Sequence, residues 1–217
     1  MITDIRTATY IESVERCNSD QLEKLYAKAV ADGVPVIKRP AQSFLKTVIA
    51  MNNPRRVLEV GTAVGFSALM MAECGPADMK ITTIENYEKR IPIARENFEK
   101  FGRADQIRLV EGDASVKLSE LADAGESYDL IFMDAAKAQY INYFPDIMRL
   151  LASGGVLISD NVLQDGDIVE SRFAVKRRDR TIHSRMREYL AVLCHDERLT
   201  TTILPIGDGI TLSVKNR

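Results

Sequence analysis

The chain has 217 residues and a net charge of −2, with 46% hydrophobic and 28% charged residues, the proportions of an ordinary soluble globular protein. Its three cysteines, Cys17, Cys74 and Cys194, are widely spaced and include no Cys-x-x-Cys pair, which argues against a disulfide framework or a structural zinc site. Residues 1–17 are polar and no long uncharged apolar run occurs, so we expect a cytoplasmic protein with no signal peptide and no membrane partner.

The first part of the chain is predicted to be helical, and a repeating pattern follows it. Two amphipathic segments, near 20–32 and 41–52, are expected to cap one side of a sheet. After them, short apolar β-rich runs alternate with amphipathic segments. The runs lie at 56–60, 80–84, 106–110, 128–133 and 155–159, and the helix-like segments at 66–74, 87–101, 114–123 and 137–151. This alternation is typical of parallel strands with crossover helices, a doubly wound α/β sheet.

The end of the chain departs from this pattern. A long helix is predicted from about 178 to 194, followed by β-rich runs at 200–204 and 210–214. Pro205-Ile-Gly-Asp-Gly209 separates the two runs and predicts a hairpin with a glycine-rich turn. An antiparallel hairpin that closes a parallel sheet gives seven strands. We expect one domain over 1–217, with a helical cap at 1–54 and an α/β core at 55–217.

A glycine-rich segment directly follows the first predicted strand. It has the sequence Glu59-Val-Gly61-Thr-Ala-Val-Gly65-Phe-Ser67 and lies where doubly wound sheets bind ligands. Glycine allows the backbone to turn tightly and to approach a ligand closely. The Gly-x-x-x-Gly spacing matches neither the dinucleotide fingerprint nor a phosphate-binding loop, and an acid before the first glycine suits an amine-bearing cofactor. The alternative is a strand–helix turn that needs glycine only for packing.

Acidic residues end the next two strands. Glu85 ends the second strand and can accept hydrogen bonds from two ribose hydroxyls, whereas Asp113, in Gly112-Asp113-Ala114, ends the third strand and could contact an adenine amino group. Either residue alone would more often be a surface carboxylate. In register at the ends of successive strands, they predict an adenosine site.

Oxygen donors end the fourth and fifth strands. Asp134 and Lys137 lie in Met133-Asp134-Ala-Ala-Lys137, and Asp160 and Asn161 follow Ser159. Two carboxylates and an amide suit a hard cation such as Mg²⁺, with water and substrate completing its shell. No His or Cys is nearby to favour a softer metal, and Lys137 is close enough to face the same cleft. The alternative is that Asp160 and Asn161 only start a helix and that Lys137 is a solvated side chain.

Together these motifs resemble the metal-dependent O-methyltransferase family that includes catechol and caffeoyl-CoA O-methyltransferases, from about Pro35 to the C-terminus. The resemblance implies a Rossmann-like class I methyltransferase fold, S-adenosylmethionine as cofactor and Mg²⁺ or another hard divalent cation. It implies that Asp134, Asp160 and Asn161 bind the metal, and that catalysis depends on Asp134 and on Lys137 as general base. The residues that it places around the cofactor are Ile37, Glu59, Gly61, Ser67, Glu85, Asp113, Ala114 and Asp134.

The chemistry of methyl transfer agrees with these roles. Transfer from a sulfonium is an in-line displacement, and the incoming oxygen is a poor nucleophile unless it is deprotonated. A divalent cation lowers the pKa of a coordinated hydroxyl, and a nearby lysine can accept the proton. Holding nucleophile and methyl group in line then supplies much of the acceleration.

The acceptor is the least determined part of the prediction. Chelation requires two neighbouring oxygens, which both a catechol and 5-hydroxyuracil offer. The segment from Arg172 to Arg187 contains seven basic residues and one acid, Asp179, and is expected near the mouth of the site, where a phosphate backbone would favour it. The residues proposed to contact nucleic acid are Lys176, Arg177, Arg178, Arg180 and Arg185. The alternative is a solvated helix face, paired with acids or with a partner subunit.

A narrower resemblance favours RNA. Asp160-Asn-Val-Leu163, Arg177-Arg-Asp-Arg-Thr-Ile-His183 and the stretch 204–214 resemble bacterial tRNA 5-hydroxyuridine methyltransferases, which form 5-methoxyuridine at the wobble position of the anticodon. This resemblance implies tRNA as the partner, with a small catechol-type acceptor as the alternative. The amphipathic N-terminal helices and the family resemblance suggest a homodimer. A regulatory cofactor-binding protein is disfavoured by the intact Lys137 and metal triad, and a dehydrogenase by the missing dinucleotide fingerprint.

Overall fold

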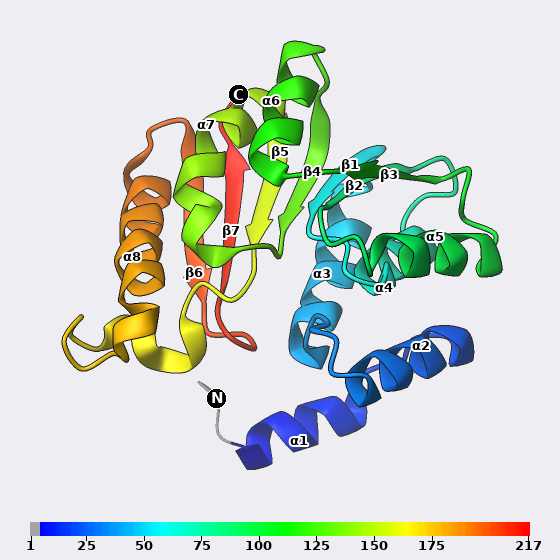
Figure 1. Ribbon diagram of the computed structural model, residues 1–217, viewed down its shortest axis with the longest axis horizontal. Coiled ribbons are helices and arrows are strands. Elements are labelled where there is room, and N and C mark those ends of the chain that lie inside the picture. Colours follow the sequence, from blue (N-terminus) through cyan, green and yellow to red (C-terminus); the bar gives the residue numbers. More distant parts are fainter. Residues whose placement is uncertain (1–4) are drawn as a thin grey trace.

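The computed structural model describes residues 5–217, so the first four residues of the polar N-terminus lie outside it (Figure 1). Within the described residues, three helices precede the first strand: α1 (Ile5–Val14), α2 (Asp20–Ala31) and α3 (Arg39–Asn52). The sequence predicted α2 and α3 but not α1. Ser19 starts α2, because its hydroxyl oxygen accepts a hydrogen bond from the backbone of Leu22 at 3.4 Å.

The strands of residues 5–217 form one seven-stranded sheet, in the order β3-β2-β1-β4-β5-β7-β6. Neighbours among β1 to β5 run parallel, whereas β7 is antiparallel to both β5 and β6. The strands are β1 (Arg56–Val60), β2 (Lys80–Glu85), β3 (Ile107–Glu111), β4 (Tyr128–Met133), β5 (Leu151–Ser159), β6 (Leu199–Leu204) and β7 (Ile210–Lys215). The prediction of a doubly wound, mostly parallel sheet with a C-terminal hairpin is confirmed.

Helices cover both faces of this sheet and divide the core into two parts (Figure 1). Because side chains alternate along a strand, Val57 packs with α3 and α4, whereas Leu58 packs with the helices on the other face. Both residues are fully buried, as expected for central parallel strands. The remaining helices are α4 (Phe66–Cys74), α5 (Ile91–Lys100), α6 (Ala114–Asp123), α7 (Tyr140–Leu150) and α8 (Arg180–His195), with the short 3₁₀ helices η1 (Lys137–Gln139), η2 (Gln164–Val169) and η3 (Arg177–Asp179).

Two helices differ clearly from the prediction, whereas the boundaries of the other predicted helices agree to within two residues. The helix expected from residue 87 begins only at Ile91, because the Glu85 carboxylate accepts hydrogen bonds from the backbone of Asn86 and Tyr87 and holds the chain in a turn. The helix expected over 137–151 is divided into η1 and α7. Among the described helices, none has the length and apolar character that crossing a membrane would require.

Candidate functional site

The motif residues gather at the carboxyl edge of the sheet because the hydrogen-bond ladder continues past the strand ends. The backbone N–H of Asp134 donates to Val60 O at 3.0 Å, and that of Asp160 donates to Met133 O at 2.9 Å. The first residues after β4 and β5 therefore keep the register of the strands before them. This arrangement is the position at which open α/β sheets bind ligands.

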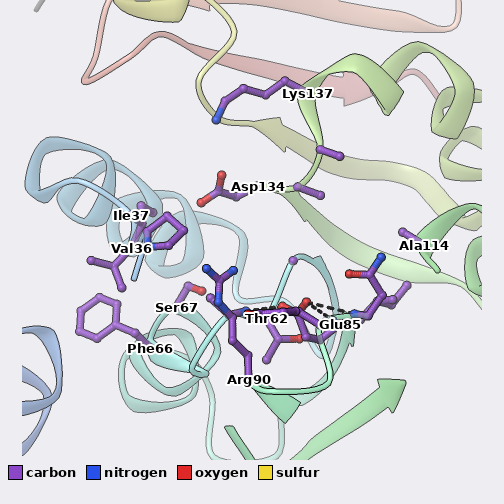
Figure 2. A pocket seen from close by; sticks show the side chains of 18 of the residues that line it. Val36, Ile37, Thr62, Phe66, Ser67, Glu85, Arg90, Ala114, Asp134 and Lys137 are labelled. Carbon is purple, nitrogen blue, oxygen red and sulfur yellow. Dashed lines mark hydrogen bonds between the residues drawn. The ribbon is translucent and has the colours of Figure 1, made fainter. Parts of the chain in front are cut away.

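A cavity of about 330 Å³ lies at this edge. Figure 2 shows Lys137 and Asp134 at one end of the cavity, with Glu85 and Arg90 at the other and Val36 and Ile37 at the side. The predicted site residues that line it are Ile37, Gly61, Ser67, Glu85, Ala114, Asp134 and Lys137. Residues from four strand ends and from the segment before α3 thus share one pocket.

Gly61 is required by close backbone packing at the floor of the cavity. Its φ is +105°, and a Cβ placed on it would lie 2.1 Å from the carbonyl oxygen of Asp134. Any other residue would therefore separate the turn after β1 from the end of β4. The turn that needs glycine for packing also lines the cavity, and its contact with a cofactor stays a prediction.

Glu85 is fixed by the backbone around it. One carboxylate oxygen accepts a hydrogen bond from Ala63 N at 2.8 Å, and the other accepts from Asn86 N at 3.0 Å and from Tyr87 N at 2.9 Å. These bonds hold the carboxylate at the cavity wall, and each of its oxygens can accept more than one hydrogen bond. A pair of ligand hydroxyls could bind there.

Glu59 lies beneath the cavity and is fully buried. Its Oε2 accepts a hydrogen bond from Thr83, whose hydroxyl is 2.6 Å from that of Thr62 in the cavity wall. Burial raises the pKa of Glu59 to about 8, although the hydroxyls of Ser67 and Thr83 oppose this shift. Within residues 5–217, its Oε1 has no hydrogen-bond partner. A buried acid with a free oxygen is a candidate partner for a positively charged ligand group.

Asp134, which is half-buried, and Asp160, which is buried, form a pair of carboxylates at the ends of β4 and β5. Burial raises the pKa of both, and the negative charge of Asp134 raises the pKa of Asp160 further. Lys137 opposes both shifts through its positive charge, so its side chain lies near the pair. Asn161 follows directly, with φ of +60°, and its backbone N–H donates to Asp160 Oδ1 at 2.7 Å. Asp160 and Asn161 are not among the cavity-lining residues but adjoin Asp134 on the neighbouring strand end.

The structure brings the predicted metal residues together, but they do not form a cluster rich in acids. Among the described residues, no three His, Cys, Asp or Glu side chains are arranged to hold a metal ion. The predicted set contains only two carboxylates, and its third donor is the amide of Asn161. Burial nevertheless raises the pKa values of both carboxylates, and the charge of Asp134 raises that of Asp160 further, so a hard cation would stabilise their ionised forms.

Asp113 lies apart from the other predicted cofactor residues. Its side chain is exposed and caps α6 by accepting a hydrogen bond from Ser115 N at 2.9 Å. It is not one of the cavity-lining residues, although Gly112 and Ala114 on either side are. Its contact with an adenine remains a prediction.

Several cavity-lining residues were not predicted from the sequence. Val36 and Phe66 contribute apolar surface, and Tyr87 and Arg90 form a further wall, with the Arg90 guanidinium 5.2 Å from the ring centroid of Tyr87. The tyrosine lies two residues beyond Glu85, so an aromatic residue just past an acid at a strand end is the signal that could have identified it. No comparable signal marks Val36, which reaches the cavity from a segment before the sheet.

The basic segment has two kinds of residue. Arg180 and Arg185 donate to backbone carbonyls, Arg180 to Val175 O at 3.3 Å and Arg185 to Ala138 O at 3.1 Å. The other three residues predicted to contact nucleic acid, Lys176, Arg177 and Arg178, are exposed. None of the five predicted nucleic-acid contacts is among the residues that line the described cavity. Two of the five therefore have structural contacts that the charge pattern did not reveal.

Known proteins share both the sequence pattern and the fold. A family model described as O-methyltransferase matches residues 11–216. A caffeoyl-CoA O-methyltransferase of Petunia hybrida is 36% identical over 177 residues, which are 78% of this chain and 72% of the relative.

Solved structures extend the similarity to the whole chain. A Staphylococcus aureus protein assigned as a caffeoyl-CoA O-methyltransferase is 33% identical, with a TM-score of 0.89 over 98% of this chain and 100% of its own. An O-methyltransferase of Bacillus cereus, solved in complex with S-adenosylhomocysteine, is 25% identical, with a TM-score of 0.86 over 100% of both chains.

Proposed function

Because the chain belongs to the O-methyltransferase family, we propose that it transfers the methyl group of S-adenosylmethionine to a hydroxyl that has a second oxygen beside it, with the help of a hard divalent cation. The observation that carries this proposal is the shared cavity, in which Glu85 lies at one end and Asp134 and Lys137 lie at the other. In this arrangement the ribose hydroxyls of the cofactor would bind at Glu85, and the sulfonium, which is bonded to the C5′ carbon of that ribose, would face the end with Asp134 and Lys137.

The proposed cofactor orientation follows from charge and hydrogen-bonding capacity. Glu85 would accept hydrogen bonds from the ribose hydroxyls, because its carboxylate is already fixed by three backbone N–H groups. Glu59 would balance the amino group of the methionine part, because it is buried and has an oxygen without a partner among the described residues. The sulfonium methyl group would then lie towards Asp134 and Lys137.

The donor set fits a hard cation. Asp134, Asp160 and Asn161 supply two carboxylates and an amide oxygen from adjacent strand ends. A divalent ion held there would lower the pKa of a hydroxyl that it binds and would fix the position of that hydroxyl. A pair of vicinal oxygens on the acceptor would satisfy such a site better than a single hydroxyl.

Lys137 is the proposed general base. Its side chain is half-buried at the cavity wall and acts electrostatically on both Asp134 and Asp160. From this position it can take the proton of the acceptor hydroxyl as the oxygen attacks the methyl group. The Phe66 and Val36 side chains at the wall would keep water away from the sulfonium.

A small acceptor with vicinal oxygens is the substrate class that the relatives favour. The Petunia protein is a caffeoyl-CoA O-methyltransferase, and the match with it covers 78% of this chain. We therefore place a catechol-type acceptor ahead of tRNA. The exposed cations Lys176, Arg177 and Arg178, with Phe173 at 83% exposure beside them, favour 5-hydroxyuridine in tRNA as the second candidate, since cations and an exposed aromatic ring together suit a nucleic acid.

A methyl-transfer assay tests both the chemistry and the substrate class. Labelled S-adenosylmethionine is offered with Mg²⁺, with or without EDTA, to caffeoyl-CoA, to a simple catechol and to tRNA bearing 5-hydroxyuridine. We expect EDTA-sensitive labelling of the small acceptors and little labelling of the tRNA. Labelling of tRNA alone would reverse the order of the candidates, and labelling that EDTA leaves unchanged would contradict the cation.

Two sets of variants complete the test. Lys137→Ala should lower kcat by about a hundredfold or more while S-adenosylhomocysteine affinity stays within about twofold. Equal loss of both would make Lys137 a structural residue. Replacing Lys176, Arg177 and Arg178 by alanine should reduce the salt dependence of any tRNA binding, and an unchanged salt dependence would exclude these residues from an RNA interface.

A further inference from the structure

The turn between β6 and β7 forms backbone hydrogen bonds with the segment that follows Asn161. Leu163 N donates to Asp208 O at 2.9 Å, and Val162 N donates to Gly209 O at 3.0 Å. Gly209 has φ of +89°, and a Cβ on it would lie 2.7 Å from the backbone nitrogen of Leu163. Only glycine allows this approach, so the two segments are held in a fixed relation.

The side chain of Asp208 uses this fixed position to contact Asn161. One of its oxygens accepts a hydrogen bond from Asn161 Nδ2 at 3.1 Å, and the other forms an ion pair with Lys38. The Asp208 side chain is only 13% exposed.

The contact determines which end of the Asn161 amide is available. An amide carries a donor nitrogen and an acceptor oxygen, and only the oxygen can bind a cation. Because the nitrogen is held by Asp208, the amide cannot rotate to present it to the cation site without losing that hydrogen bond. Groups that orient a ligand in this way strongly affect metal affinity.

We propose that Asp208 is a positioning residue of the cation site, which fixes the Asn161 amide with its oxygen available to the metal and is itself held by Lys38. This inference rests on the proposed function, because it requires the cation site of Asp134, Asp160 and Asn161. Lys38 immediately follows Pro35, Val36 and Ile37 in the cavity wall, so the same ion pair connects that side of the pocket to the proposed cation site.

Manganese binding without turnover tests the proposal. The dissociation constant of Mn²⁺ is measured by calorimetry or electron paramagnetic resonance, with S-adenosylhomocysteine present and no acceptor. Asp208→Ala should weaken Mn²⁺ binding by about tenfold to a hundredfold. Asp208→Asn keeps an oxygen that accepts from Asn161 and should stay within about fivefold of the unmodified protein. Asp196→Ala is the matched control, because Asp196 at the other end of the hairpin is also ion-paired and 13% exposed, and it should change nothing.

A double variant separates positioning from a simple charge effect. If Asp208 acts through Asn161, adding Asp208→Ala to Asn161→Ala should weaken Mn²⁺ binding no further than Asn161→Ala alone. Each of three results would overturn the inference. The losses of Mn²⁺ affinity could add up in the double variant, they could be equal in Asp208→Asn and Asp208→Ala, or Asp208→Ala could bind Mn²⁺ within twofold of normal. If the unmodified protein binds Mn²⁺ no better than an Asp160→Ala variant, the cation site of the proposed function itself fails.

Discussion

Replacing Glu59 by glutamine should change how the stability of the cofactor-free protein depends on pH. Glu59 is fully buried, and burial raises its pKa from 4.5 to about 8. The folded protein therefore keeps a proton on this side chain over a pH range in which the unfolded chain has lost it. Glutamine has nearly the same shape but cannot titrate, so the substitution isolates this one ionisation.

The sign and size of the effect follow from proton linkage. Between the two pKa values the folded state binds more protons than the unfolded state, so the free energy of unfolding falls as the pH rises. The loss is small below the unfolded pKa and stops once the pH passes the folded value near 8. A single group shifted in this way lowers the free energy of unfolding by about 3.5 kcal/mol between about pH 5 and about pH 8.

Urea unfolding at several pH values measures this quantity. The free energy of unfolding is determined for the unmodified protein and for Glu59→Gln at each pH, and the difference between them removes the contributions of all other groups. We expect that difference to fall by about 3.5 kcal/mol from about pH 5 to about pH 8, and to level off above it. Parallel pH profiles for the two proteins would refute the assignment of a protonated, buried Glu59.

Three further substitutions test the strand ends. Gly61→Ala should destabilise the protein by about 3 kcal/mol or more in urea unfolding, because its Cβ would lie 2.1 Å from the Asp134 carbonyl oxygen; a stable variant with normal S-adenosylhomocysteine affinity would contradict the packing argument. Tyr140→Phe removes a buried hydroxyl that donates to Met133 O at 3.1 Å. It should lower the free energy of unfolding in urea by about 1–3 kcal/mol. An unchanged free energy of unfolding would show that Met133 O finds another hydrogen-bond donor. Asp160→Asn should abolish measurable Mn²⁺ binding. It should also stabilise the metal-free protein at about pH 8 in urea unfolding, since burial and Asp134 disfavour the charge of Asp160; destabilisation there would contradict the raised pKa.

The sequence predicted the sheet well because its signals are local and periodic. The boundaries of β1 and β4 are those expected, since both strands are short β-rich runs that are mostly buried on both faces. The positions of the site residues followed from the same pattern: an acid directly after a parallel strand must lie at the carboxyl edge of the sheet. Asp134, Asp160 and Glu85 could therefore be assigned before any coordinates were known.

Helix ends and side-chain partners were less predictable. α5 starts late because the Glu85 carboxylate accepts a hydrogen bond from the backbone of Tyr87, before the helix. The helix propensities of the residues do not indicate this contact. Asp113 also caps α6, a local contact that the strand pattern did not indicate, and its predicted contact with an adenine stays a prediction. Arg185 looked like a surface cation but donates to a carbonyl in η1, a contact made across 47 residues of chain.

The sequence by itself determined the order of strands and helices along the chain, the family, and which residues end the strands. These features depend on neighbouring residues and on the spacing of apolar residues along the chain. Only the tertiary structure decided that Glu59 is buried with an oxygen lacking a partner among the described residues, and that Asp208 holds Asn161. Burial and contacts of this kind depend on segments that meet only after the sheet has formed; Lys38 and Asp208 are 170 residues apart. Local pattern carries no information about such pairs, and the proton and metal affinities of the site depend on them.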